Sequence, residues 1–232
     1  AMLKEFGPEI WIAEGPTVRA AAGFHYPTRM AIIRLSSEGL VVWSPVAFSP
    51  ELGSAVDALG TVRYIVPPNS LHDTFLAEWQ QAYPDAAILA PPGLRRKRPD
   101  LVFAGELAGI TVPGWQAEID VVVVPGNRIT SEAVLFHRAS GTAIFADLLQ
   151  QFSPGWFKGW RALVARLDLM TRQTPSVPRK FRLAFTNRDA ARFAVRQILD
   201  WPSKRVLIAH GTPVSKNGQA FLRGAFRWLI KS

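Results

Sequence analysis

Residues 206–213 read Val-Leu-Ile-Ala-His-Gly-Thr-Pro, a short apolar run that meets one polar residue and then a turn. Val206 to Ala209 predict a buried strand, and Gly211 and Pro213 predict the turn that follows it. His210 therefore marks the point where this strand ends. Because α/β proteins collect their ligand sites at the carboxyl ends of strands, His210 is a candidate site residue.

Two further side chains that can bind a metal occupy similar places elsewhere in the chain. Asp147 follows the predicted strand Ala143 to Phe145, and His72 lies in the first turn of a helix that follows the strand Val62 to Val66. Imidazole nitrogen and carboxylate oxygen suit zinc or iron, and three protein ligands leave a coordination position for water. We therefore predict a hydrolytic metal site of His72, Asp147 and His210.

Each of these residues also has a purely structural explanation. Asp147 can cap a helix expected after it, His72 can pack on its own helix, and His210 can orient its turn through a backbone hydrogen bond. Ser70 and Asp73 have the spacing of a capping box at the start of the helix that carries His72. The residue pattern leaves both explanations open.

Strands and helices are expected to alternate in blocks along the chain. The periodicity and the turn residues predict strands at Ile10 to Ala13, Met30 to Leu35, Leu40 to Trp43, Val62 to Val66, Ala87 to Ala90, Ile110 to Val112, Ile119 to Val124, Ala133 to Phe136, Ala143 to Phe145 and Val206 to Ala209. They predict helices between Ser49 and Gly60, from Leu71 until Pro84, and over Trp156 to Met170, Thr186 to Leu199 and Gln219 to Ile230. Two β-blocks, each followed by helices, predict a layered α/β fold and one domain over residues 1–232.

The composition excludes several classes of protein. Apolar residues make up 48% of the chain and charged residues 19%, which supports a large core, and the absence of cysteine excludes disulfides, thiolate zinc sites and a cysteine nucleophile. No apolar run approaches the roughly 18 to 20 residues of a membrane helix, and the start lacks a basic segment followed by an apolar one. We expect a cytoplasmic protein with no membrane partner, in which Met2 is the natural start.

The net charge of +9 is concentrated in the last third of the chain. Residues 151–232 contain 16 Lys and Arg against three Asp and Glu, whereas residues 1–150 contain 11 against 15. A basic region can attract nucleic acid or a small acidic ligand. It can also be a solvated helical face, because no nucleic-acid-binding motif accompanies the arginines.

Six stretches of the sequence carry a resemblance to a known family. They are Tyr26-Pro27-Thr28-Arg29-Met30, Trp43-Ser44-Pro45, Pro68-Asn69-Ser70-Leu71-His72, Ala90-Pro91-Pro92-Gly93-Leu94-Arg95-Arg96-Lys97, Phe145-Ala146-Asp147-Leu148 and Ala209-His210-Gly211. In them the chain resembles an uncharacterised domain-of-unknown-function family, a divergent branch of the metallo-β-lactamase fold superfamily. The resemblance implies a four-layer αββα sandwich, in which two packed β-sheets are flanked by helices.

The resemblance also implies a metal site that is smaller than that of the superfamily. The four side-chain places of the superfamily's HxHxDH motif are taken in order by Pro67, Asn69, Leu71 and His72, so only the last histidine is retained. Asn127 takes the place of the histidine that follows a Pro-Gly turn, whereas Asp147 and His210 match the metal-bridging aspartate and the last histidine. What remains resembles the second metal position alone, so the resemblance implies one zinc or iron ion at most, and the superfamily's proton-handling aspartate is absent.

Three functions stay open at this point. The first is a mononuclear zinc or iron hydrolase that uses Asp147, Asn69 and Asn127 in catalysis and Arg95, Arg96 and Lys97 to attract an anionic substrate. The second is a non-catalytic module on a degenerate hydrolase scaffold that binds nucleic acid through the basic last third. The third is non-catalytic binding of a small anionic ligand by Asn69, His72 and His210 without a metal. The oligomeric state is open in all three cases.

Overall fold

The strands of this protein form where apolar and β-branched residues alternate or run together between turn residues. The computed structural model describes residues 2–107, 112 and 114–231. Its strands are β1 (Lys4–Gly7), β2 (Ile10–Arg19), β3 (His25–Arg34), β4 (Gly39–Trp43), β5 (Thr61–Val66), β6 (Ala87–Ala90), β7 (Gly105–Glu106), β8 (Ile119–Val124), β9 (Glu132–His137), β10 (Thr142–Gln150) and β11 (Arg205–His210). Its helices are the 3-10 turn η1 (Ala21–Gly23), α1 (Pro50–Asp57), α2 (Leu76–Ala82), α3 (Leu94–Lys97), α4 (Trp160–Leu167), α5 (Arg179–Ala184), α6 (Arg188–Asp200), α7 (Gly218–Ala225) and α8 (Arg227–Ile230).

Within the described residues, the strands form two mixed sheets. The first has the order β1-β2-β3-β4-β5-β6-β7, antiparallel from β1 to β4 and parallel from there to β7. The second has the order β11-β10-β9-β8, in which only the β10–β11 pair is parallel. Each parallel connection needs a crossover, and α1, α2, α5 and α6 lie in such crossovers.

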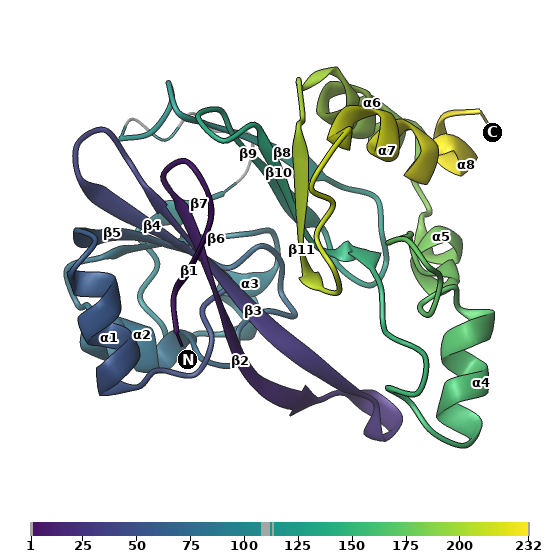
Figure 1. The fold of residues 1–232 in the computed structure, drawn as a ribbon, viewed down its shortest axis with the longest axis horizontal. Coiled ribbons are helices and arrows are strands. Elements are labelled where there is room, and N and C mark those ends of the chain that lie inside the picture. Colours follow the sequence, from purple (N-terminus) through teal and green to yellow (C-terminus); the bar gives the residue numbers. More distant parts are fainter. Residues whose placement is uncertain (1, 108–111, 113, 232) are drawn as a thin grey trace.

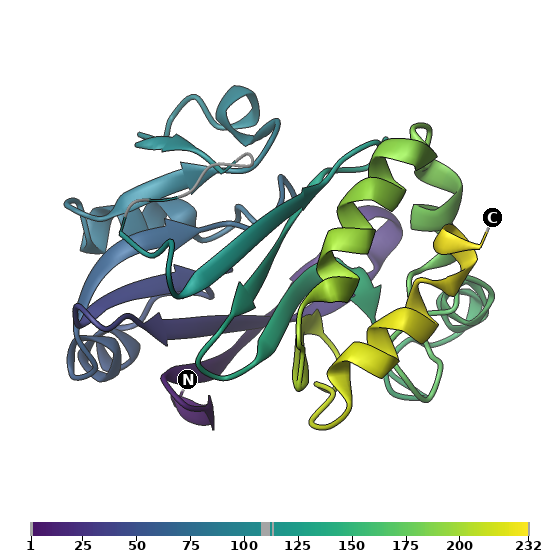
Figure 2. The ribbon, with the colours of Figure 1, turned by 90° about the horizontal axis from the view of Figure 1, so that it is seen from above.

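The two sheets pack face to face with helices on their outer sides, which makes four layers (Figure 1, Figure 2). Side chains alternate between the faces of β3: Ala31 and Ile33 join the core between the sheets, while Met30 and Ile32 face the core under α1 and α2. A third core lies between the second sheet and helices α5 to α8. The expected αββα sandwich is confirmed.

Most strands lie where the sequence predicted them, with differences at their ends. β2 and β3 are much longer than predicted, because Pro16 and Pro27 interrupt an apolar pattern that the backbone nevertheless continues as a hairpin. β1 and β7 are too short and polar to give a signal. The strand predicted at 110–112 lies mostly outside the described residues.

The helices required more corrections. The helix predicted from Leu71 begins only at Leu76, the one predicted over Trp156 to Met170 is limited to Trp160–Leu167, and the closing helix is broken at Phe226. The α1 cap is as predicted, since Ser49 Oγ accepts a hydrogen bond from Leu52 N at 3.1 Å. No helix in the described ranges is both long enough and apolar enough to cross a membrane.

The long β2–β3 hairpin reaches beyond the first sheet and contacts the segment around α4 (Figure 1). Trp156 Nε1 donates to His25 O at 2.9 Å, and Arg161 Nε donates to Ala22 O at 2.9 Å. A small apolar cluster that includes Phe24, Phe152 and Phe157 fills the space between them. The hairpin and α4 therefore form one wall of the molecule.

Strand β10 continues past the point where the sequence predicted its end. Its pairing with β11 shifts register between Phe145 and Gln150. In this irregular part, the side chain of Glu132 in the neighbouring β9 accepts hydrogen bonds from the β10 backbone. The Glu132 carboxylate accepts hydrogen bonds from the amides of Ala146 (3.1 Å), Asp147 (2.7 Å) and Leu148 (3.3 Å). A buried side chain thus satisfies backbone donors that the ladder leaves free, and no helix follows Asp147 directly.

His137, the last residue of β9, provides a test of burial in the second sheet. It is 1% exposed, and its Nδ1 lies 2.7 Å from Ser140 Oγ. Burial lowers the pKa of His137 to about 4, although the negative charges of Glu118 and Glu9 act to raise it. Between about pH 6.5 and pH 4, His137 is protonated in the unfolded chain and neutral in the folded chain. The free energy of unfolding therefore decreases as the pH falls through this range. We expect His137→Asn to remove about 3 kcal/mol of acid-induced destabilisation, measured by urea unfolding at pH 7 and pH 4. Parallel losses in both proteins would contradict this.

Glu132 provides a second test, because all of its hydrogen-bond partners are donors. In Glu132→Gln an amide NH₂ replaces one acceptor and faces backbone N–H groups in a buried place, so we expect a loss of about 2 kcal/mol or more in the free energy of unfolding. The matched control is Glu118→Gln, since Glu118 accepts hydrogen bonds from Ser36 N and Oγ at the surface. The control should change stability by about 0.5 kcal/mol or less. Equal losses in urea unfolding would show that the buried amides do not depend on the carboxylate.

Candidate metal centre

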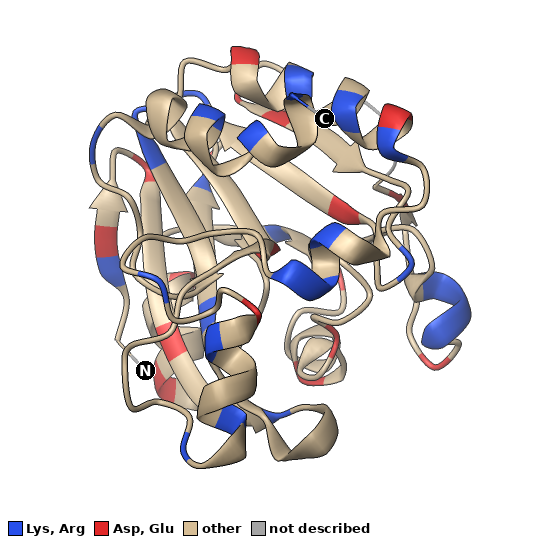
Figure 3. Ribbon diagram, turned by 90° about the vertical axis from the view of Figure 1, so that its right-hand side faces the viewer, with Lys and Arg blue, Asp and Glu red and all other residues tan. Residues whose placement is uncertain are grey.

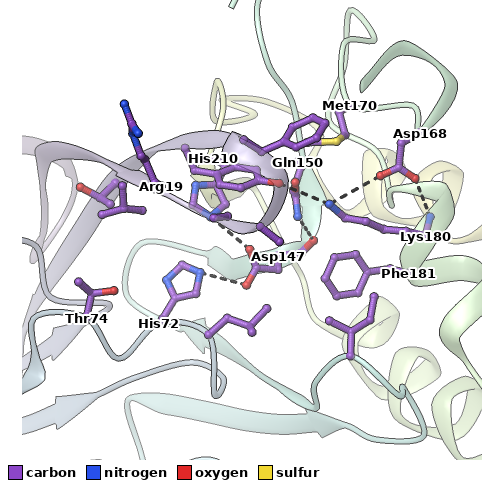
Figure 4. Close-up of a pocket in the computed structure, with 18 of the residues that line it drawn as sticks. Arg19, His72, Thr74, Asp147, Gln150, Asp168, Met170, Lys180, Phe181 and His210 are labelled. Atoms are coloured by element: carbon purple, nitrogen blue, oxygen red, sulfur yellow. Dashed lines mark hydrogen bonds and ion pairs between the residues drawn. The ribbon is translucent and has the colours of Figure 1, made fainter. Parts of the chain in front are cut away.

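Three segments bring His72, Asp147 and His210 together (Figure 4). His72 comes from the loop between β5 and α2, Asp147 from the irregular part of β10, and His210 from the end of β11. His72 Nε2 lies 3.1 Å from Asp147 Oδ2, and His210 Nε2 lies 3.1 Å from Asp147 Oδ1. The three candidates of the sequence are therefore neighbours.

Two details of this placement differ from the expectation. His72 is not in a helix, because Asn69 Oδ1 accepts a hydrogen bond from Leu71 N at 2.9 Å and favours a turn there. The capping box is also absent: Ser70 Oγ bonds to Thr130 Oγ1, and Asp73 forms ion pairs with Lys97 and Arg98. Only His210 lies at a regular strand end, as predicted.

The ring of His72 is oriented by Ser44. Ser44 Oγ lies 2.8 Å from His72 Nδ1, which leaves Nε2 to face Asp147. Ser44 follows β4 and has a φ of 49°, a left-handed conformation that costs a non-glycine residue about 1–2 kcal/mol. Backbone strain of this kind persists at functional sites, where the surrounding structure holds the residue in place.

The ring of His210 is held by the β3 strand of the other sheet. His210 Nδ1 is 2.8 Å from Pro27 O, which can only accept, so Nδ1 carries the hydrogen and Nε2 is left for the site. The ring also contacts Tyr26 at a centroid distance of 5.3 Å. Arg29 donates to the carbonyls of Ile208 (2.8 Å) and Gly211 (2.6 Å) and so fixes the end of β11 against β3.

Asn69 holds the side chain of Asp147, and Glu132 holds its backbone amide. Asn69 Nδ2 donates to Asp147 Oδ2 at 2.8 Å and to Glu132 Oε1 at 3.0 Å. Burial alone would raise the pKa of Asp147, but His72 and His210 outweigh it and keep the pKa well below its usual range. Burial and the Asp147 charge raise the pKa of Glu132 to about 7. Burial opposes protonation of His72, yet attraction by Asp147 raises the pKa of that imidazole.

The donor set is one that can bind a divalent ion. One ligand atom from each of the three residues lies within 4.8 Å of the other two, whereas tetrahedral ligands with bonds of about 2.0–2.1 Å to zinc lie about 3.3 Å apart. The two 3.1 Å contacts join the imidazoles to different oxygens of Asp147. Nδ1 of His210 donates to a carbonyl, the usual arrangement for a metal-binding histidine. Gln150, which lines the same cavity, has a buried Oε1 with no donor among the described residues.

The other residues that the sequence proposed for catalysis or binding are placed differently. Asn69 is 0% exposed and both of its amide atoms bond within the protein, so it positions Asp147 and does not face a substrate. Asn127, which was predicted to act in catalysis, bonds to Phe181 O and Ile129 N and does not line the cavity.

The basic segment around α3 meets the site only through its last residue. Lys97 lines the cavity and donates to Ser70 O and Asp73 Oδ1, which ties α3 to the loop that carries His72. Arg95 bonds to Glu106 and lies over the Phe103 ring, and neither Arg95 nor Arg96 lines the cavity. Of the three residues predicted to bind substrate, Lys97 is the one that lines this cavity.

The site lies in a cavity of about 940 Å³ between the β2–β3 hairpin and the segments of α4 and α5. Most of its lining is apolar, and its charged residues are Arg19, Arg29, Lys97, Asp147, Asp168, Arg179 and Lys180. Arg29 is paired with Glu14, and Lys180 lies 3.7 Å from Asp168 (Figure 4). Positive charge therefore prevails at the cavity.

Much of the basic last third supports the protein's own structure. Lys and Arg outnumber Asp and Glu on the helices of this face (Figure 3). Arg182 donates to Val177 O and lies over the Trp228 ring, which Arg188 also approaches. Arg192 donates to Leu229 O and pairs with Asp189. These contacts match the structural explanation of the arginines.

Three supporting residues were not singled out from the sequence as site residues. Ser44 lies in the Trp43-Ser44-Pro45 stretch, which was noted only for its resemblance. Glu132 has a visible signal, because it is an acidic residue at the start of an otherwise apolar strand. Gln150 lacks one, since nothing in the sequence shows that β10 reaches it.

Similarity to solved structures supports the fold. No curated protein matches this sequence. A metallo-β-lactamase from Pontibacter korlensis matches with a TM-score of 0.63 at 14% identity, covering 100% of this chain and 99% of its own. The metallo-β-lactamase FIM-1 from Pseudomonas aeruginosa, in its mono-zinc form, matches with 0.62 at 11%, covering 99% and 93%. The Flv1 flavodiiron core from Synechocystis sp. PCC6803 matches with 0.64 at 9%, covering 99% and 60%.

The sequence itself defines the family. Residues 9–154, more than half of the chain, match a family described as Domain of unknown function (DUF4336). This segment contains His72 and Asp147, whereas His210 lies beyond it. The expected resemblance of such a family to the metallo-β-lactamase fold is confirmed by the similar structures. The chain belongs to the DUF4336 family and has a metallo-β-lactamase-like αββα fold.

Proposed function

We propose that this protein is a hydrolase that binds one zinc or iron ion through His72, Asp147 and His210 and acts on an anionic substrate. The observation that carries the proposal is the convergence of these three side chains on one cavity, with ligand atoms within 4.8 Å of one another. A bound ion of this kind lowers the pKa of its water ligand and supplies hydroxide near neutral pH.

A single ion is proposed because the rest of the superfamily's donor set is missing. Pro67, Leu71 and Asn127 carry no side chain that binds zinc strongly, and Asn69 is already bonded on both sides. Among the described residues, His72, Asp147 and His210 are the one group of three His, Cys, Asp or Glu close enough to share an ion. FIM-1, solved in a mono-zinc form, shares the fold.

The remaining residues position the donors and attract the substrate. Ser44 and Pro27 orient the two imidazoles, and Asn69 holds the aspartate. Lys97 and Lys180 at the cavity supply positive charge for an anionic group. Asp73 does not replace the missing acid/base residue, because it is paired with Lys97 and Arg98 and does not line the cavity.

The first test is titration of zinc into chelator-treated protein by calorimetry. We expect one ion per chain, and affinity reduced by more than about 100-fold in His72→Ala, Asp147→Asn and His210→Ala, because each loses a ligand. The controls are His25→Ala, a histidine outside the cluster, and Asp168→Asn, a cavity carboxylate outside it. No stoichiometric binding of zinc or ferrous iron, or the same loss in the controls, would refute the proposal.

The second test separates the two properties of Ser44. Ser44→Ala and Ser44→Gly both remove the hydroxyl at 2.8 Å from His72, and we expect both to weaken zinc affinity by about 10–100-fold. Only Ser44→Gly also relieves the left-handed backbone, so it should be more stable than Ser44→Ala by about 1 kcal/mol. Calorimetry and urea unfolding measure the two effects. Unchanged affinity in both variants would show that Ser44 does not orient the ligand.

A further inference from the structure

Exposed apolar side chains gather at the mouth of the cavity. Ten large hydrophobic residues are exposed within the described ranges, and five of them line the cavity: Leu71, Ile129, Val164, Leu167 and Leu183. Their exposed fractions run from 39% for Ile129 to 74% for Leu183. Single exposed hydrophobic residues are ordinary, but a continuous group on the rim of one cavity indicates a binding surface.

Helix α4 presents this surface in a regular pattern. Trp160, Leu163, Val164 and Leu167 are spaced as i, i+3, i+4 and i+7, so they share one helix face, and all four are 41–59% exposed. Only Ala165 of this helix is buried. The apolar stripe therefore faces outward, and it is continuous with the cavity through Val164 and Leu167.

Positive charge lies directly beside the apolar wall. Arg179 and Lys180 begin α5, the helix that carries Leu183, and both line the cavity together with Arg19. Arg19 and Lys180 are labelled in Figure 4. Lys180 is shared with Asp168, whereas no side-chain ion pair of Arg19 or Arg179 occurs among the described residues. The opening thus combines a long apolar surface with three cations, Arg19, Arg179 and Lys180, against one carboxylate, Asp168, which attracts both Arg179 and Lys180.

We propose that the ligand of this cavity is an amphipathic anion, with an alkyl or acyl chain on the apolar wall and its acidic group beside Arg179 and Lys180. As a statement about substrate, this rests on the proposed function of the His72–Asp147–His210 site. A small polar anion would leave Leu167 and Leu183 in water, and a neutral lipid would leave the excess of positive charge of Arg19, Arg179 and Lys180 over Asp168 unbalanced. Only a molecule with both parts matches the whole lining.

The test uses decyl phosphate below its micelle concentration, with inorganic phosphate and decyl maltoside as comparison ligands. Binding is measured on chelator-treated protein by calorimetry, so that it does not depend on a metal. We expect decyl phosphate to bind at least about tenfold more tightly than either comparison ligand, which lacks one of the two parts. Equal binding of all three, or binding of inorganic phosphate alone, would overturn the proposal.

Substitutions at the rim locate the site. Leu167→Asp and Leu183→Asp place a charge on two different helices and should each weaken decyl phosphate binding by about tenfold, and Lys180→Gln should weaken it too. Phe193→Asp and Val102→Asp are matched controls, because these side chains are 71% and 76% exposed and do not line the cavity. Thermal unfolding checks that all variants fold.

The outcomes separate this inference from the metal proposal. Zinc binding without selective decyl phosphate binding overturns the amphipathic ligand and leaves the metal site. Selective decyl phosphate binding without zinc binding supports the ligand and removes the hydrolase proposal. If Leu167→Asp and Leu183→Asp turn a dimer into a monomer on a sizing column and leave decyl phosphate binding unchanged, the apolar rim is an interface between copies and the inference is wrong.

Discussion

The candidate site depends on the carboxylate of Glu132. It lies inside the second sheet, accepts the backbone amides of Ala146, Asp147 and Leu148, and meets Asn69 of the other half of the chain. These bonds replace part of the regular ladder between β10 and β11, and the irregularity presents Asp147 to the cavity. An apolar residue at position 132 would leave several buried N–H groups without a partner, so an acceptor is needed here even though burial and the Asp147 charge raise the pKa of Glu132 to about 7.

The stretches that carry the family resemblance converge on this one place. Tyr26 to Arg29 supply the ring contact, the carbonyl and the guanidinium that hold His210 and its strand. Ser44 orients His72, and Lys97 ties the His72 loop to α3. Motifs that are scattered in sequence are therefore the support of the three proposed ligands. The physical reason is that a ligand ring must be fixed at its second nitrogen before its first can be presented in one direction.

The sequence predicted the class of fold, most strands and the identity of the central trio, because strand periodicity and polar residues at strand ends are local signals. It could not predict the β10 irregularity, since the bonds that create it come from Glu132, 14 to 16 residues away. The prediction that His72 lies in a helix was wrong for a similar reason. The side chain of Asn69 accepts a hydrogen bond from Leu71 N and favours a turn, and Asn69 is held in place by its bond to the distant Glu132. Asn127 and Arg95 were assigned roles from motif position and charge, but Asn127 bonds to the carbonyl of Phe181 and the amide of Ile129, and Arg95 bonds to the carboxylate of Glu106.

The three proposed ligands come from opposite halves of the sandwich: His72 follows a strand of the first sheet, while Asp147 and His210 belong to the second. Any ion or molecule that contacts all three would act as a noncovalent cross-link between the sheets. It would close a loop of roughly 75 residues between His72 and Asp147, and neither half alone offers the full set of contacts. A bound ion or ligand would therefore make the whole chain unfold more cooperatively, in a sharper transition at a higher temperature or denaturant concentration. A fragment that contains only one sheet would not respond in this way.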